Sequence, residues 1–247
     1  LGSAAWSEEA DQALEWAPRV DTGQAHVTER TGFVPPAFPT DHIAAAVARG
    51  LDPAKALPVS HDSRTLDLVS PVKDQGACGS CYAFGSAGDL ESRMLAGGDP
   101  LLDLSENSIK ECNYQGTSCA GGNQYVTMNY LSYHGAPLES CDPYVDRDVP
   151  CTSGCQAQVA VLEWRSLSGS TLPDPALLKQ YLLDFGPLQT TVYAGDQYEP
   201  SWAQAFQDYD GSYVLYNPSG RSPNHSVLLV GWNDDLVHAG GTGAWIV

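Results

Sequence analysis

The sequence has little positive charge. Of its 247 residues only 12 are Lys or Arg, against 30 Asp and Glu, which gives a formal net charge of −18. A surface this acidic repels phosphate backbones, so nucleic acid is not an expected partner. No apolar run approaches the roughly 18 residues that a membrane span needs, so no membrane partner is expected either. Hydrophobic residues still make up 43%, enough for one large domain or two packed lobes.

Cysteine is absent before position 78 and after position 155. If disulfides form, the odd number of cysteines leaves one thiol unpaired. A zinc site is the alternative reading of the C-x-x-C spacing at Cys78 and Cys81, but Cys151 and Cys155 make a poor second pair, so we expect no metal. Disulfides predict an oxidising compartment, which could be extracellular, periplasmic or lysosome-like. The seven cysteines are Cys78, Cys81, Cys112, Cys119, Cys141, Cys151 and Cys155.

Residues 1–56 differ from the rest of the chain. They contain no cysteine, and two short helical patterns begin near Ser7 and Asp41. Between them, Val34-Pro35-Pro36 predicts an extended linker or a turn. We interpret this region as an N-terminal extension or a prosegment rather than as part of the body of the fold.

The remainder changes from helical to extended patterns along the chain. Apolar spacing, caps and glycine stops predict helices over residues 81–95, 105–109, 125–131 and 175–185. Strands are predicted at 188–193, 212–216, 226–232 and 244–247. Helices followed by strands indicate an α+β fold with two segregated parts and a boundary near 160–170.

One motif is specific. The run from Gln75 to Phe84 reads Q-G-A-C-G-S-C-Y-A-F, and it resembles the signature of the papain and cathepsin family of cysteine peptidases. Further segments resemble the blocks of the same family, so that the resemblance covers residues 57–247. They are Leu57-Pro58, Ser70 to Asp74, Leu104 to Cys112, Cys119 to Gly122, and Asn224-His225-Ser226 at the head of an apolar strand.

The resemblance implies a papain-like fold with a helical left lobe, an antiparallel β-barrel-like right lobe and the active-site cleft between them. On this reading residues 57–165 form the lobe with the nucleophile and residues 166–247 the lobe with the histidine. It also implies a monomeric, exported endopeptidase without a cofactor, acting on protein or peptide substrates. The N-terminal region would then be the prosegment of a zymogen, or a simple extension.

The resemblance assigns catalytic roles to three residues. Cys81 would be the nucleophile at the first turn of a helix, where the helix dipole and a nearby imidazolium stabilise a thiolate. Cysteines paired in this way have a pKa of about 3–4. His225 would be the general acid and base, and the side-chain amide of Gln75 would donate to the oxyanion together with the backbone N–H of Cys81.

The same match gives substrate-binding positions and a disulfide. Gly122, with Gly121, would approach the substrate backbone closely. A pocket more polar than is common in the family would be lined by Asn123, Gln124, Thr191 and Pro223, with Asn224 beside it. Cys78 would bond to Cys119. Cys112 would pair with Cys151 or Cys155 and Cys141 would take the other, an open choice because spacing does not fix connectivity.

Two features depart from the family pattern. Tyr82 stands where a tryptophan is usual, which is a tolerated variant. The block that supplies the orienting asparagine normally follows a strand like Gly243 to Val247, where this sequence stops, and we interpret it as C-terminally truncated. Two alternatives stay open: an inactive homologue that binds peptides, and a transpeptidase or ligase of the same fold.

Overall fold

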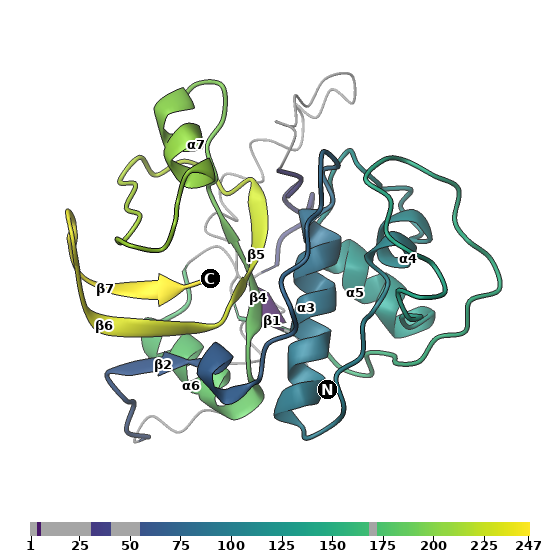
Figure 1. Cartoon of the computed structure of the whole chain (residues 1–247), viewed down its shortest axis with the longest axis horizontal. Helices are drawn as coiled ribbons and strands as arrows, with labels where there is room; N and C mark the ends of the chain where they lie inside the picture. The colour runs from purple at the N-terminus through teal and green to yellow at the C-terminus, as the bar shows by residue number, and fades with distance from the viewer. Residues whose placement is uncertain (1–3, 6–30, 41–54, 168–171) are drawn as a thin grey trace.

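The computed structural model describes residues 4–5, 31–40, 55–167 and 172–247. Its helices and strands segregate into two lobes that meet along helix α3, as Figure 1 shows. The chain is therefore a mixed helical and antiparallel-sheet fold, as the sequence predicts. None of the described helices is both long enough and apolar enough to span a membrane.

The first lobe is built from three helices: α3 (Cys81–Ala96), α4 (Glu106–Glu111) and α5 (Gln124–Tyr133). They begin and end close to the predicted positions. The Ser105 hydroxyl accepts from the N–H of Ser108 and caps α4, while Asn123 caps α5. Apolar side chains from all three helices share one core, which contains Leu90, Ile109, Met128 and Leu131 among others.

The second lobe contains two open sheets. The first has the order β3-β1-β4-β5, in which β4 (Leu188–Val192) and β5 (His225–Leu229) pair antiparallel, and β1 (Ala4–Ala5) pairs parallel with β3 (Arg165–Ser166) and β4. The second has the order β2-β6-β7, from β2 (Ser60–Asp62), β6 (Gly231–His238) and β7 (Gly241–Ile246). The β-barrel-like expectation was too loose, because these strands close no barrel within the described ranges.

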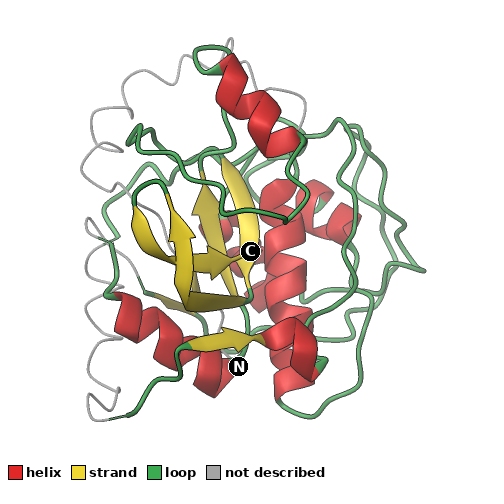
Figure 2. Ribbon diagram, turned by 60° about the vertical axis from the view of Figure 1, so that its left-hand side comes forward, coloured by secondary structure: helices red, strands yellow, loops and turns green. Residues whose placement is uncertain are grey.

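Helices cover the second lobe as well. Helix α6 (Pro175–Phe185) begins where Asp174 accepts from the N–H of Ala176 and Pro175 occupies the first turn, as predicted. It packs Leu178, Tyr181 and Leu182 onto Leu188, Leu229 and Trp232. A short 3-10 helix, η3 (Ser63–Leu66), and helix α7 (Pro200–Gln207) complete the elements, and Figure 2 shows the helices flanking the strands.

Two strand predictions were wrong. Residues 212–216 form no strand, because Tyr209 and Tyr213 instead close a local turn: their rings lie 5.3 Å apart, and the Tyr209 hydroxyl donates to the Tyr213 carbonyl. The predicted strand 226–232 is divided into β5 and β6. A β-carbon on Gly231 would lie 2.1 Å from the carbonyl oxygen of His61, so β6 pairs with β2 at this point only because a glycine stands there. The helices predicted near Ser7 and Asp41 lie outside the described residues.

Residues 31–40 lie between the lobes rather than apart from them. This segment, the violet trace beside the upper end of α3 in Figure 1, forms an isolated parallel bridge between Phe33 and Gly122. The prediction of a linker or turn at Val34-Pro35-Pro36 was therefore incomplete, because the start of that stretch is bonded to the first lobe. The lobe boundaries that the sequence indicates remain a prediction.

Candidate active site

Cys81 opens helix α3, as predicted. Its side chain is 1% exposed, and it is the one cysteine of the seven outside a disulfide. Backbone N–H groups of Cys81 and Tyr82, at the first turn of the helix, lower the pKa of the thiol. The N–H groups of Ser226 and Gly32, from other parts of the chain, act on it in the same direction. The sulfur is thus surrounded by donors that would favour an anion.

Burial nevertheless controls the protonation of this thiol. It raises the pKa of Cys81 to about 12, against the opposing effect of the four N–H groups. The expected thiolate with a strongly lowered pKa is therefore not the state of this arrangement, in which Cys81 is a neutral thiol. The physical reason is that burial excludes water from the Cys81 sulfur, and Gly32 is one of the residues that cover it.

His225 opens strand β5, one residue before the Ser226 N–H that meets the sulfur. Burial lowers the pKa of His225 to about 4, so the imidazole is neutral at neutral pH. Its Nδ1 atom is buried and makes no hydrogen bond within the described part of the chain, and its ring lies 6.1 Å from that of Phe206. The structure thus brings the predicted nucleophile and base to the same junction, with both uncharged.

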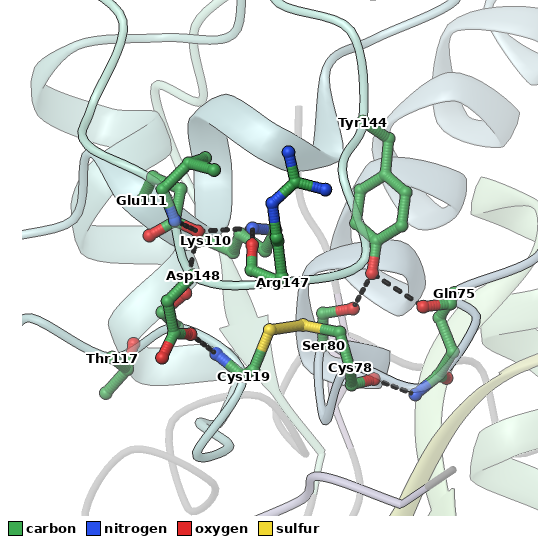
Figure 3. Close-up of a disulfide and its surroundings, with 12 residues drawn as sticks. Gln75, Cys78, Ser80, Lys110, Glu111, Thr117, Cys119, Tyr144, Arg147 and Asp148 are labelled. Carbon is green, nitrogen blue, oxygen red and sulfur yellow. Dashed lines mark hydrogen bonds and ion pairs between the residues drawn. A yellow bond between two sulfur atoms is a disulfide. The ribbon is translucent and has the colours of Figure 1, made fainter. Parts of the chain in front are cut away.

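The loop before α3 holds Gln75 by several bonds. The side-chain Nε2 of Gln75 donates to the carbonyl of Cys78 at 2.8 Å, and the Tyr144 hydroxyl donates to the carbonyl of Gln75 at 2.7 Å. The Tyr144 hydroxyl also lies 2.6 Å from that of Ser80, as Figure 3 shows beside the disulfide. The amide of Gln75 is therefore positioned on the loop that carries the nucleophile, although one of its N–H groups is occupied by Cys78.

Gly122 bonds to the backbone of residues 32–34, and Gly121 lies close to it. The N–H of Gly122 donates to the carbonyl of Gly32 at 2.8 Å, and the N–H of Val34 donates to the carbonyl of Gly122 at 2.9 Å. A β-carbon on Gly121, whose φ is +101°, would lie 2.6 Å from the Gly32 carbonyl oxygen. The two glycines thus allow an extended chain to pair with this edge, which is the role predicted for a substrate backbone.

The other predicted binding residues differ in whether they contact residues 32–34. Asn123 contacts the segment, since its Nδ2 donates to the carbonyl of Val34 at 2.9 Å. Asn224 contacts it only through its own carbonyl, which accepts from Gly32 and Phe33, while its side chain bonds to Ala194 and Gly195. Gln124, Thr191 and Pro223 are buried, at the start of α5, within β4 and just before β5 respectively.

Three disulfides use the remaining cysteines. Cys78 bonds to Cys119, as the resemblance implies. Of the two open arrangements, the structure has Cys112 with Cys151 and Cys141 with Cys155. The three bridges indicate an oxidising compartment, as the cysteine content predicts.

An ionic cluster with two buried carboxylates, Glu91 and Glu106, surrounds Lys73 at the start of the loop that carries Gln75. The Lys73 amine lies 2.8 Å from Glu106, 3.2 Å from Glu91 and 2.7 Å from Asp103. Burial raises the pKa of Glu106 to about 7, although the charge of Lys73 opposes the rise. The cluster ties α3 and α4 to the start of the loop and makes this region sensitive to pH.

Residues that the sequence reasoning missed also shape the junction. Gln189, Ser226 and Tyr144 bond to the segments that carry Cys81, His225 and Gln75. Gln189 gave only a weak signal, because it is one of three consecutive polar residues in the strand sequence LQTTV and nothing there says which partner it meets. Tyr144 gave no such signal, because its partners are 64 and 69 residues away in sequence.

Comparison with known proteins identifies the family of the chain. A sequence model described as papain family cysteine protease matches residues 57–247. The chain is similar to mouse cathepsin K, with 31% identity over 77% of the chain, and to human cathepsin O, with 31% identity over 79%. It spans 55% and 57% of those two relatives. The solved structure of digestive procathepsin L2 proteinase from the larval midgut of Tenebrio molitor matches with a TM-score of 0.72 and 27% identity, covering 91% of this chain and 70% of that one.

Proposed function

Because the chain belongs to the papain family of cysteine proteases, we propose that it is an endopeptidase that acts through a thioester on Cys81. The observation that carries the proposal is the position of the one unbridged thiol. It lies at the first turn of α3, and its pKa is lowered by the backbone N–H of Ser226, the residue that follows His225. We further propose that the protein acts as a monomer on protein substrates, in an exported or lysosome-like compartment and without nucleic acid.

The reaction proceeds in two steps. The Cys81 thiolate attacks the scissile carbonyl carbon, the His225 imidazolium gives its proton to the leaving amine, and the C–N bond breaks to leave a thioester. Neutral His225 then takes a proton from water, the hydroxide attacks the thioester, and the C–S bond breaks to release a carboxylic acid and restore the thiolate and the imidazolium. The backbone N–H of Cys81 and the amide of Gln75 would stabilise the oxyanion in both steps, which requires Gln75 to direct its free N–H to the substrate.

Residues 31–40 would keep this site inactive. Their backbone occupies the hydrogen-bonding edge at Gly122 and the carbonyl of Asn224. The group of this segment that acts on the thiol is the N–H of Gly32, which also donates to the carbonyl of Asn224 and is not an electrophilic carbon. The segment would therefore block substrates without being cut at that bond, and it would hold Cys81 in its neutral form by excluding water.

The segment also suggests which substrates fit. Phe33 pairs with Gly122 and is 7% exposed, so the site seats a large aromatic side chain there. The amide of Asn123 is occupied by the cap of α5 and by Val34, which leaves less polarity at this position than the sequence indicates. We expect peptides with a bulky apolar residue at the position that pairs with Gly122 to be preferred.

Labelling of the nucleophile tests the proposal. The full-length protein, before and after limited proteolysis that removes the region around residues 31–40, is incubated with a thiol-directed covalent inhibitor and with an unfolded protein substrate. We expect labelling at Cys81 and cleavage after removal, with both abolished in Cys81→Ser. Cleavage that persists in Cys81→Ser would overturn the proposal.

The same experiment addresses the alternatives. A processed protein that neither labels nor cleaves but retains peptides would be a binding homologue. The presence of both Cys81 and His225 at one junction counts against that function. A transpeptidase would join an added amine to the acyl group, so a ligated product that outweighs the hydrolysed one would identify it.

A further inference from the structure

Gln189 is the second residue of strand β4, and it is 3% exposed. Its Nε2 donates to the carbonyl of Tyr82 at 3.2 Å and to the hydroxyl of Ser226 at 3.0 Å. Its Oε1 accepts from the hydroxyl of Ser86 at 2.9 Å. One amide thus joins helix α3 to strand β5 across the junction of the lobes, and each of its side-chain polar atoms has a partner.

The two residues that share the Nε2 are neighbours of the catalytic pair. Tyr82 follows Cys81, and Ser226 follows His225. We propose that Gln189 is a positioning residue that fixes the separation and orientation of Cys81 and His225. The inference rests on the proposed peptidase function, and it adds a residue that touches neither the substrate nor the reacting atoms.

The chemistry of a buried amide supports this role over simple packing. A buried amide is tolerated only when its hydrogen bonds are made, and an apolar side chain would fill the same volume without that requirement. What the amide adds is direction, because its bonds hold only at one relative placement of α3, β4 and β5. Apolar contacts alone would allow the helix to slide against the strands.

The residues around Gln189 leave space for its hydrogen bonds to α3 and β5 and extend them to other elements. A β-carbon on Gly85 would lie 2.7 Å from the Ser226 hydroxyl and 3.0 Å from Gln189 Nε2, so the strands reach the helix only because a glycine stands there. The Ser86 hydroxyl also lies 2.6 Å from that of Thr127 on α5. The backbone N–H of Gln189 donates to the buried carboxylate of Asp89 at 3.2 Å. The link therefore extends from β5 through α3 to the helix that follows Gly122.

The test compares two substitutions on the same strand. Gln189→Met keeps the volume and removes the bonds, whereas Thr190→Val removes a buried hydroxyl that has no hydrogen-bond partner among the described residues. In the activated full-length protein we expect kcat of Gln189→Met to fall by about tenfold to a hundredfold with KM within about twofold, as misplaced reacting groups do. The pH at which Cys81 alkylation reaches half its maximum should also rise towards the roughly 8.5 of an isolated cysteine. Thr190→Val should leave both unchanged.

Each result decides one of the two proposals. If Gln189→Met only melts at a lower temperature while its kcat and alkylation profile equal those of Thr190→Val, the residue is structural and the inference is wrong. If Gln189→Met does not fold, Ser226→Ala, which removes one partner of the Nε2, should still lower kcat by about threefold to tenfold, an amount equivalent to one hydrogen bond. An unchanged kcat there would also overturn the inference. A wild-type protein that neither labels nor cleaves would instead overturn the peptidase function on which it rests.

Discussion

A β-carbon on Gly32 would lie 2.0 Å from the carbonyl oxygen of Gly79, two residues before the nucleophile. This oxygen is a backbone atom of the loop that the Cys78–Cys119 disulfide holds in place. It therefore cannot move away as a flexible side chain could. The passage of residues 31–34 over the site therefore depends on the absence of a side chain at position 32.

Gly32→Ala should accordingly displace the segment from the site. The added methyl group meets Gly79, the bonds at Gly122 and Asn224 weaken, and water reaches the sulfur. We expect the rate of Cys81 alkylation in the intact protein to rise by at least about fivefold, since the loss of two hydrogen bonds amounts to about 1–3 kcal/mol. Ala37→Ser, at an exposed position of the same segment, serves as the control and should not change the rate. Equal rates in the two variants would contradict the proposed inhibition.

The substitution Asn123→Asp should keep the cap of α5 while it removes the hydrogen bond from residue 123 to residues 31–40. The carboxylate keeps an oxygen for the N–H groups of Tyr125 and Val126, and aspartate caps helices about as well as asparagine. It replaces the N–H that binds the Val34 carbonyl with an oxygen that repels it. We expect an unchanged melting temperature together with faster alkylation of Cys81. A loss of helical signal, or alkylation at the wild-type rate, would speak against this division of roles.

The pH dependence of Cys81 alkylation should change when the segment is removed. In the intact protein burial raises the pKa of Cys81 to about 12, so the thiol stays protonated at neutral pH and alkylation should increase only in strongly alkaline solution. Restored solvent, together with the N–H groups at the start of α3, should lower that pKa and let His225 take up a proton. We expect alkylation at pH 7 to become at least about a hundredfold faster, because two units of pKa change the thiolate fraction by that factor.

Cys81→Ser is the control for this measurement, because the other six cysteines are bridged and should not react. If the intact protein were alkylated at pH 7 as fast as a free cysteine, the segment would not cover the sulfur in solution.

Glu106 should make the fold more stable in mild acid than at neutral pH. Its pKa is raised to about 7 by burial, from 4.5, so the folded state holds this proton more tightly than the unfolded state does. The resulting stability is fully present below pH 4.5 and is lost as the pH rises through 7. Lys73, Glu91 and Tyr144 are the charged or titratable neighbours that face it, and Asp103 reaches it through Lys73.

Glu106→Gln should remove this dependence. Between pH 5 and 7.5 we expect wild type to lose about 2 kcal/mol more than the variant, or about 4–8 °C in melting temperature. Glu163→Gln, at a carboxylate whose side chain is 61% exposed, is the matched control and should behave as wild type. Parallel pH profiles of Glu106→Gln and wild type would show that the carboxylate titrates normally.

Much of this site follows from local sequence. The run from Gln75 to Phe84 sets a turn, a disulfide partner, a helix start and a nucleophile within ten positions, and the caps at Ser105, Asn123 and Asp174 are local hydrogen bonds. Such features involve residues a few positions apart, so a single sequence is enough to predict them. The disulfide of Cys112 was left open for the opposite reason, because its two candidate partners are only four residues apart.

The tertiary structure alone decided which distant segments share the junction. Gln189 meets Tyr82 across 107 residues, and Asn123 meets Val34 across 89. Cys81 is a neutral thiol because Gly32, which lies 49 positions earlier in the chain, helps to exclude water from it. No periodicity or motif in the sequence predicts that contact. Sequence determined the chemical groups and their immediate geometry. Packing decided their charge state, because the free energy of an ion depends on everything that surrounds it.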